Sequence, residues 1–330
     1  MQSHSGRFLA LILAGATQLG AQPFARSSMT EERVVSPAET GVVAATGVSF
    51  VPIQFRHDSG IRPFVPVMMN GKTFLLMVHA NAKLYAMTTH ANAGSIGLSH
   101  LGKTSDYGIS SSGHVSDLGR TDTTLALLQV GAAKSSDVTL TVFEIPQTPK
   151  TDGMLGIDWL RDEHVIVDYD SYRIGIPANA EASKSEDEGL LLRGYLAHRM
   201  TWDPAVKGFY VMCQINGVSA RLGISTVAET VVDSVFARGA GFELGPVVDQ
   251  NGGPKGALVD SFLFKHQVSI VLDGQSTAPA QPLSWDLSAY SSVPRPSGPH
   301  DDGYLGAEFM LANQAIIDFG TETLFIAVQK

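Results

Sequence analysis

Acidic residues recur along this chain in three pairs, each with a spacing of 150 positions. The pairs are Asp152 with Asp302, Asp158 with Glu308, and Asp168 with Asp318. Two carboxylates held close together share one proton, so that one can act as a base and the other as an acid in hydrolysis. Each pair is therefore a candidate for acid–base chemistry if the fold brings its two members together.

Each pair also has a structural explanation. Asp152 and Asp302 precede glycines in turns, where Asp side chains commonly bond the backbone two residues further on. Asp158 and Glu308 stand at the start of short predicted helices, where negative charge suits the helix N-terminus. The third pair ends two predicted strands. These explanations favour a role in the scaffold over a relocated catalytic pair.

The acids belong to a longer internal repeat. Residues 151–160 (TDGMLGIDWL) return as residues 301–310 (DDGYLGAEFM). Each copy runs into an apolar segment that ends in an acid and an aromatic, at residues 165–169 and 315–319. A repeat of this kind indicates an internal duplication and predicts two similar halves.

The segments upstream of the repeat predict β-hairpins. Residues 64–69 and 74–78 flank an Asn-Gly pair, and residues 209–215 and 220–224 flank another. Asn-Gly between apolar runs is a strong signal for a two-residue hairpin turn. Helix signals are few and short, and cover residues 157–163, 230–237 and 307–313. The sequence therefore predicts an all-β protein with few short helices.

Composition divides the chain into five parts. Residues 1–21 are typical of a signal peptide, with an apolar core too short to span a bilayer, which needs roughly 20 residues. Residues 22–47 read as a flexible lead-in, and residues 181–189 as an acidic linker between an N-terminal lobe, 48–180, and a C-terminal lobe, 190–330. We therefore expect an exported, periplasmic or extracellular protein with no membrane span after signal removal.

Charge and cysteine content exclude several classes of function. A net charge of −9 and a pI near 5.5 argue against nucleic-acid binding, because no basic patch could release phosphate counterions. Cys213 is the sole cysteine, so no intrachain disulfide forms, and we expect it to be buried in a strand. The spacings of the ten histidines match no short-range zinc pattern, and we expect neither a metal nor a cofactor.

A hairpin followed by a Gly-hydrophobic-Leu-Gly turn into a short helix, present twice over residues 48–330, resembles the retropepsin-like and pepsin-like aspartic proteases. The chain is similar to a duplicated, single-chain member. The resemblance implies two lobes of the acid-protease barrel type related by a pseudo-two-fold axis. It also implies one catalytic Asp-Thr-Gly-Ala motif after the hairpin of each half, and a peptide bound in the interlobe cleft.

The motif positions depart from the family pattern in both halves. Residues 79–82 read HANA and residues 225–228 read STVA. His79 and Ser225 therefore stand where the resemblance implies the catalytic aspartates, and Asn81 and Val227 stand where it implies glycines. The residues expected to bind a ligand are then as follows: His79, Asn81, Ser225 and Thr226.

Three functions remain open from the sequence. The first is an inactive homologue that binds an extended peptide or a protein in the former active-site cleft. The second is an active hydrolase, either through relocated acids or through a His79–Ser225 pair, which would need an orienting acid and oxyanion donors. The third is a structural interaction module. Gly-rich segments at residues 108–113 and 250–256 are expected near the flaps of the two lobes.

Overall fold

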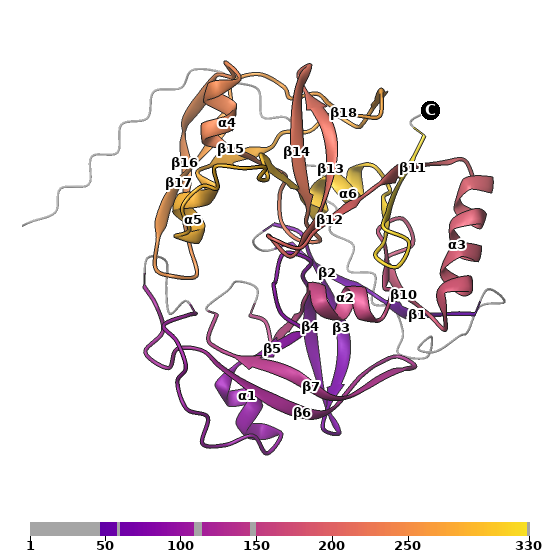
Figure 1. The fold of residues 1–330 in the computed structure, drawn as a ribbon, viewed down its shortest axis with the longest axis vertical. Helices are drawn as coiled ribbons and strands as arrows, with labels where there is room; N and C mark the ends of the chain where they lie inside the picture. Colours follow the sequence, from indigo (N-terminus) through magenta and orange to yellow (C-terminus); the bar gives the residue numbers. More distant parts are fainter. Residues whose placement is uncertain (1–46, 58–59, 109–113, 146–149, 329–330) are drawn as a thin grey trace, which may run out of the picture. The chain divides into compact units, whose positions relative to one another are not determined.

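A computed structural model describes residues 47–57, 60–108, 114–145 and 150–328 (Figure 1). The predicted signal peptide and nearly all of the predicted lead-in lie outside the described residues. Within the described part of the chain, none of the helices has the length and apolar character that a membrane crossing requires.

The first half of the chain forms a seven-stranded sheet. Its fourth strand is a short segment of the repeat, and its second strand also pairs with its seventh, so the sheet closes on itself. In spatial order the strands are β2 (Gln54–Arg56), β3 (Arg62–Met69), β4 (Lys72–Val78), β8 (Gly153–Leu155), β5 (Ala86–Thr88), β7 (Ala133–Val142) and β6 (Thr121–Val130).

The second half forms a ten-stranded sheet. In spatial order the strands are β16 (Leu244–Gly252), β17 (Leu258–Phe264), β20 (Leu283–Trp285), β15 (Val231–Asp233), β21 (Gly303–Leu305), β14 (Val218–Ile224), β13 (Gly208–Ile215), β18 (Ile270–Leu272) and β19 (Gln275–Ser276), with β12 (Thr201–Asp203) paired to β13.

The two sheets share one pattern of connections. In the first half β4 pairs in parallel with β8, β8 pairs antiparallel with β5, and β5 pairs in parallel with β7. In the second half β14, β21, β15 and β20 repeat these three pairings in the same order and sense. The duplication read from the sequence is therefore present in the strand order, and the predicted all-β fold of two similar lobes is confirmed.

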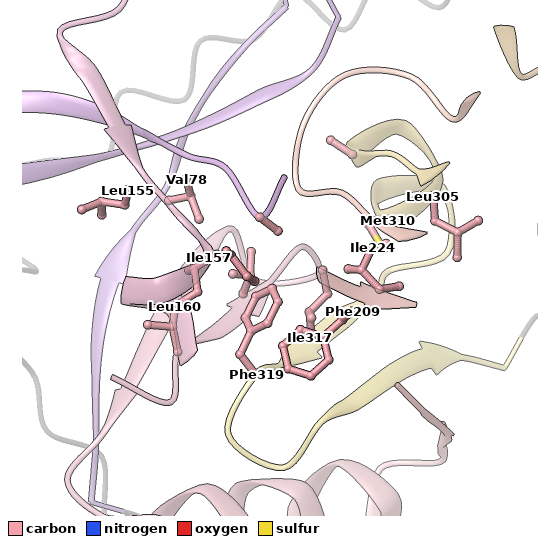
Figure 2. Packing of buried hydrophobic residues seen from close by; sticks show 14 of the residues in the cluster. Val78, Leu155, Ile157, Leu160, Phe209, Ile224, Leu305, Met310, Ile317 and Phe319 are labelled. Carbon is pink, nitrogen blue, oxygen red and sulfur yellow. The ribbon is translucent and has the colours of Figure 1, made fainter. Parts of the chain in front are cut away.

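A six-stranded sheet joins the halves. Its strands are β1 (Val48–Pro52), β10 (Arg173–Pro177), β9 (Ile166–Asp168), β22 (Ile316–Asp318), β23 (Thr323–Ala327) and β11 (Tyr195–Arg199). The repeat strands β9 and β22 pair at its centre, with Val167 opposite Ile317. Figure 2 shows Ile317 and Phe319 packed among apolar side chains from both halves, such as Leu160 and Phe209.

Both Asn-Gly turns form as predicted. Asn70 and Asn216 have φ of 45° and 48°, and the glycine after each has φ above 80°, which is the left-handed backbone of a type I′ turn. Each Asn side chain also accepts a backbone bond: Asn70 from Leu127 N of β6, and Asn216 from Ser269 N, just before β18. The turns fix the register of the β3–β4 and β13–β14 hairpins. The second strand of each hairpin ends immediately before a motif, at Val78 and at Ile224.

The helices of the described residues are short. They are α1 (His90–Ser95), α2 (Ile157–Asp162), α3 (Ala180–Leu192), α4 (Ser234–Gly239), α5 (Leu287–Ser291) and α6 (Ala307–Ala312). The repeat helices α2 and α6 form where the sequence predicts them. The helix predicted over residues 230–237 is only partly correct: β15 takes residues 231–233, and Asp233 caps a helix that begins at Ser234.

The predicted acidic linker, residues 181–189, is not a solvated loop. It lies inside α3, which Asn179 caps by accepting the N–H of Ala182. Ser183 and Leu190 are buried, and Leu190 packs in an apolar cluster with residues of the six-stranded sheet. The segment is a packed helix because small and apolar side chains lie on its buried side. The charged residues between them made the sequence resemble a solvated linker.

Candidate functional site

The two motif positions occupy equivalent places in the two halves. His79 directly follows β4 and Ser225 directly follows β14. The backbone N–H of His79 donates to Leu155 O at 2.9 Å, and that of Ser225 donates to Leu305 O at 2.9 Å. The parallel pairs β4–β8 and β14–β21 thus hold the two motifs in equivalent positions of the two sheets.

Thr226 links the two loops. Its Oγ1 donates to Val78 O at 2.7 Å and accepts the N–H of Ala80 at 2.9 Å, so one buried hydroxyl of the second half makes two bonds to the first half. The matching position in the first half is Ala80, which has no hydroxyl to return the bond. Tyr169 adds support by donating its hydroxyl to Thr226 O at 2.8 Å.

The Ser225 hydroxyl is used within its own loop. It donates to Val227 O at 3.1 Å and accepts Val227 N–H at 3.3 Å, and Ser225 is only 3 % exposed. Across the described part of the chain, no hydrogen bond joins Ser225 to His79. The hydroxyl is therefore positioned as a loop-stabilising group.

His79 accepts a bond of the same type, with Asn81 N–H donating to its Nδ1 at 3.3 Å. A nitrogen that accepts carries no proton, so the neutral ring holds its proton on Nε2. Burial, and to a lesser extent the positive charges of Arg62 and Lys83, lower the pKa of His79 to about 3. Among the described residues, no carboxylate is hydrogen-bonded to His79, whereas a His–Ser nucleophile requires a carboxylate that orients the ring.

Val227 fills space at the second motif. Val227 is 9 % exposed. It packs in a cluster whose other buried members, among the described residues, all come from the first half. Its partners there are Phe64, Met77, Leu84, Met87, Phe143 and Met154. A glycine at this position would present no side chain to the cluster. The replacement therefore adds apolar packing between the two halves.

The first acid pair braces the hairpins. Asp152 Oδ2 accepts Leu75 N–H at 3.1 Å, and Asp302 Oδ2 accepts Arg221 N–H at 3.0 Å. A side-chain bond to the backbone two positions on is made by the preceding residue, Thr151, whose Oγ1 accepts Gly153 N–H. The interpretation as turn residues was thus incomplete, because these carboxylates reach across to a neighbouring strand.

The other acid pairs also serve the scaffold. Asp158 and Glu308 lie in the first turns of α2 and α6, as predicted. Asp168 and Asp318 each accept backbone N–H groups from the two residues of the turn that follows, through Oδ1. Among the described residues, none of the three pairs has its two carboxylates hydrogen-bonded to each other.

Two charged residues beside the motif were missed by the sequence analysis. Arg62 begins β3 and pairs with Arg56 of β2. After burial, the positive charge of Arg62 is the largest influence that lowers the pKa of His79. Lys83 follows the first motif and donates its Nζ to Lys207 O at 2.8 Å.

The second Gly-rich segment reaches the first half. Residues 250–256 lie at the tip of the β16–β17 hairpin, as predicted for a hairpin tip. Gly108 N–H donates to Pro254 O at 3.3 Å. A side chain on Gly253 would overlap the Tyr290 carbonyl, so the tip packs closely on α5. Residues 109–113 lie outside the described residues.

Other candidate sites lie elsewhere or are not supported. Within the described ranges, no group of three or more His, Cys, Asp or Glu residues is arranged to hold a metal ion. Cys213 is 5 % exposed, as expected. An open hollow of about 340 Å³ lies on the second half, and Tyr210, Arg221 and His300 are among its lining residues.

No protein-family model and no curated protein sequence matches the chain. Solved structures do match. An aspartic proteinase from Irpex lacteus is 13% identical, with 86% of this chain and 98% of that chain covered and a TM-score of 0.46. Basic 7S globulin from soybean is 10% identical, with 86% and 95% covered and a TM-score of 0.44.

A shorter match is to a retropepsin-like aspartic protease from Rickettsia conorii. It is 15% identical, with 39% of this chain and 91% of that chain covered and a TM-score of 0.31. The assignment of fold rests on this chain's own strand order: two copies of one sheet pattern, joined by β9 and β22 and linked by Thr226. The chain has the two-lobed fold of the retropepsin-like and pepsin-like aspartic proteases.

Proposed function

We propose that this protein does not hydrolyse peptides, and that it binds an extended peptide in the former active-site cleft, over the loops that carry His79 and Ser225. The observation that carries the proposal is the chemistry at these two positions. A neutral imidazole and an internally bonded hydroxyl stand where the fold places two carboxylates in hydrolytic relatives.

The contacts of these residues favour binding over hydrolysis. A water molecule attacks a peptide bond only when a base takes its proton as the bond forms. His79 uses Nδ1 to accept from Asn81 and retains its proton on Nε2, and the Ser225 hydroxyl is committed to Val227. Neither side chain is therefore a free base. The positive charges of Arg62 and Lys83 also disfavour the protonated form of His79, which would be needed for it to act as a general acid.

The two motif loops are held by direct hydrogen bonds although neither carries an acid. Thr226 still bonds across to the first half, and the backbone bonds at both motif positions have equal lengths. Binding of an extended peptide by strand addition uses backbone hydrogen bonds and does not require a catalytic pair. A preserved loop geometry without carboxylates therefore suits a peptide-binding role.

We further propose that the protein is exported, on the basis of the N-terminal segment with its apolar core. Edman sequencing of protein recovered from cell fractions tests this. A mature N-terminus near residue 22 in the exported fraction supports export, and an intact N-terminus confined to the cytoplasm would overturn it.

Peptide binding is tested by recovery of intact ligand. Purified protein is incubated with a mixture of unstructured peptides, separated by gel filtration, and the bound peptides are identified by mass spectrometry. We expect full-length peptides to co-elute with the protein. Recovery of shortened peptides with new termini, or of none at all, would contradict the proposal.

A further inference from the structure

The β13–β14 hairpin of the second half (Figure 1) borders the open hollow of about 340 Å³. Neither His79 nor Ser225 is among its lining residues, which include Tyr210, Met212, Arg221, Pro299, His300 and Asp302. We propose that this hollow binds a basic side chain, lysine or arginine, of a peptide or protein partner. This site is separate from the former active-site cleft, so either kind of binding can hold without the other.

The equivalent face of the first half is filled by the protein itself. Counted from the Asn-Gly turns, the cross-strand pair Phe64–Met77 corresponds to Tyr210–Gly223. Phe64 and Met77 are buried in an apolar cluster whose other first-half members are Leu84, Met87, Phe143 and Met154. Tyr210, in contrast, is half-buried and lines the hollow. The duplication has therefore kept the hairpin and left this face of the second copy open.

Arg221 lines the hollow, but its charge is already balanced. Its guanidinium lies over the ring of Tyr210, with Cζ 3.7 Å from the ring centroid. Nε donates to Asp301 Oδ1 at 2.8 Å, and Nη2 donates to Asp203 Oδ2 at 2.6 Å. One guanidinium thus faces two carboxylates, and the group as a whole carries excess negative charge. An anionic ligand would add to that excess, so the hollow favours a cation.

His300 and Asp302 provide hydrogen-bond acceptors at the hollow. His300 Nδ1–H donates to Gly298 O at 2.9 Å, so the neutral ring presents a lone pair at Nε2. This nitrogen lies 3.9 Å from Asp302 Oδ1, too far for a direct hydrogen bond. Asp302 Oδ2 is used to accept Arg221 N–H at 3.0 Å. Two neighbouring acceptors, one of them charged, suit an ammonium or guanidinium group, which has several N–H donors.

Other parts of the lining suit the apolar stem of such a side chain. Met212 is 55 % exposed, and Tyr210 and Pro299 add apolar surface. Lysine and arginine lay their methylene groups along surfaces of this kind while the charged end makes polar contacts. The volume lies near the lower end of the range for ligand sites, about 300–1,000 Å³, and so suits a single side chain. The net charge of −9 adds a long-range preference for basic partners.

Three blocked peptides with identical alanine flanks test the inference. Their central residue is arginine, lysine or citrulline, the last being a neutral isostere of arginine. The full chain is labelled at its methionine methyl groups and titrated with each peptide by nuclear magnetic resonance. The Met212 signal, assigned from the spectrum of Met212→Leu, reports binding at the hollow itself. The arginine and lysine peptides also show which of the two cations the hollow prefers.

We expect the better of the two basic peptides to shift the Met212 signal with a Kd about tenfold lower than that of the citrulline peptide. His300→Ala and Asp302→Asn should each bring the affinity for the basic peptide towards that for the citrulline peptide. The matched control is His266→Ala, which removes an exposed histidine of the same half and should leave the ratio unchanged. Because the readout is a ratio between two peptides, a general loss of folded protein does not reproduce it.

Equal affinity for the three peptides, or no binding of any of them, would overturn the inference. Shifts confined to methionines other than Met212 would place the basic side chain outside the hollow and would also contradict it. A ratio that is unchanged in both His300→Ala and Asp302→Asn would do the same. None of these results decides whether extended peptides bind in the former cleft, which the recovery of intact peptides tests separately.

Discussion

The hydroxyl of Thr226 donates to the carbonyl of Val78 at 2.7 Å, so that a side chain of the second half holds the strand end that precedes His79 in the first. The same oxygen accepts Ala80 N–H. The link is one-sided, because Ala80 stands at the equivalent position of the first half. One residue therefore carries a contact between the halves that a symmetric pair would share.

Removing that hydroxyl should be costly. Thr226→Val keeps the side-chain shape but leaves a buried N–H and a buried carbonyl without their partner, which we expect to lower the free energy of unfolding by about 2–4 kcal/mol. Urea denaturation followed by circular dichroism measures the loss. The control is Thr73→Val on exposed β4 surface. Equal, small losses of unfolding free energy in both variants would contradict a stabilising role for the Thr226 hydroxyl.

The side chain at position 227 should stabilise the contact between the halves. Val227→Ala removes two methyl groups from a cluster formed mainly by the first half, and we expect a loss of about 1–3 kcal/mol. The matched control is Val235→Ala, since Val235 is 46 % exposed on α4. The thermal unfolding midpoints of the two variants measure the two losses of stability. A smaller effect at position 227 than at 235 would contradict the packing.

His79 should make the protein less stable as the pH falls. Its folded pKa, about 3, lies below the ordinary value of 6.5, so the unfolded chain binds a proton that the folded chain refuses. This contribution to stability is present above about pH 6.5 and is lost progressively towards pH 3. His79→Gln should lose less stability than the unmodified protein between pH 6.5 and pH 4, measured by urea midpoints. A parallel pH dependence would refute the assignment.

Asp187 in α3 should have the opposite effect. Burial, and then the neighbouring negative charge of Asp318, raises the pKa of Asp187 to about 7, above its ordinary value of 3.8. The stability it confers is therefore present at low pH and is lost as the pH rises from about 4 to about 7. Asp187→Asn should flatten this loss.

The control for Asp187 is Glu188→Gln, an exposed change in the same helix. Urea midpoints at pH 5 and pH 8 should converge for Asp187→Asn and differ for Glu188→Gln. If the two variants behave alike, the Asp187 carboxyl does not titrate with folding.

Much of the fold was predictable because local signals repeat. The Asn-Gly turns and the Gly-x-Leu-Gly segments determine backbone geometry within a few residues, and the structure forms hairpins and short helices at both copies. The α3 helix was not predictable in the same way. Its charged sequence is typical of a solvated segment, and only the sheet beneath Leu190 makes it a packed helix.

The places of the two motif loops along the chain were predictable, but the contacts of their side chains were not. The motif mapping placed His79 and Ser225 correctly after β4 and β14. It did not reveal that Ser225 bonds its own loop, nor that Val227 packs against the other half. The Ser225 bond depends on the side-chain rotamer within the loop, and the Val227 packing joins residues far apart in the chain, which one sequence does not relate to one another.

The central claim is that the loops of His79 and Ser225 do not catalyse hydrolysis. The most direct measurement is mass spectrometry of an unfolded protein substrate incubated with the purified chain from pH 3 to pH 7, with and without pepstatin. We expect no new peptide termini above those seen with the Ser225→Ala variant. Termini that form with the unmodified chain, and disappear with pepstatin or in Ser225→Ala, would contradict the account.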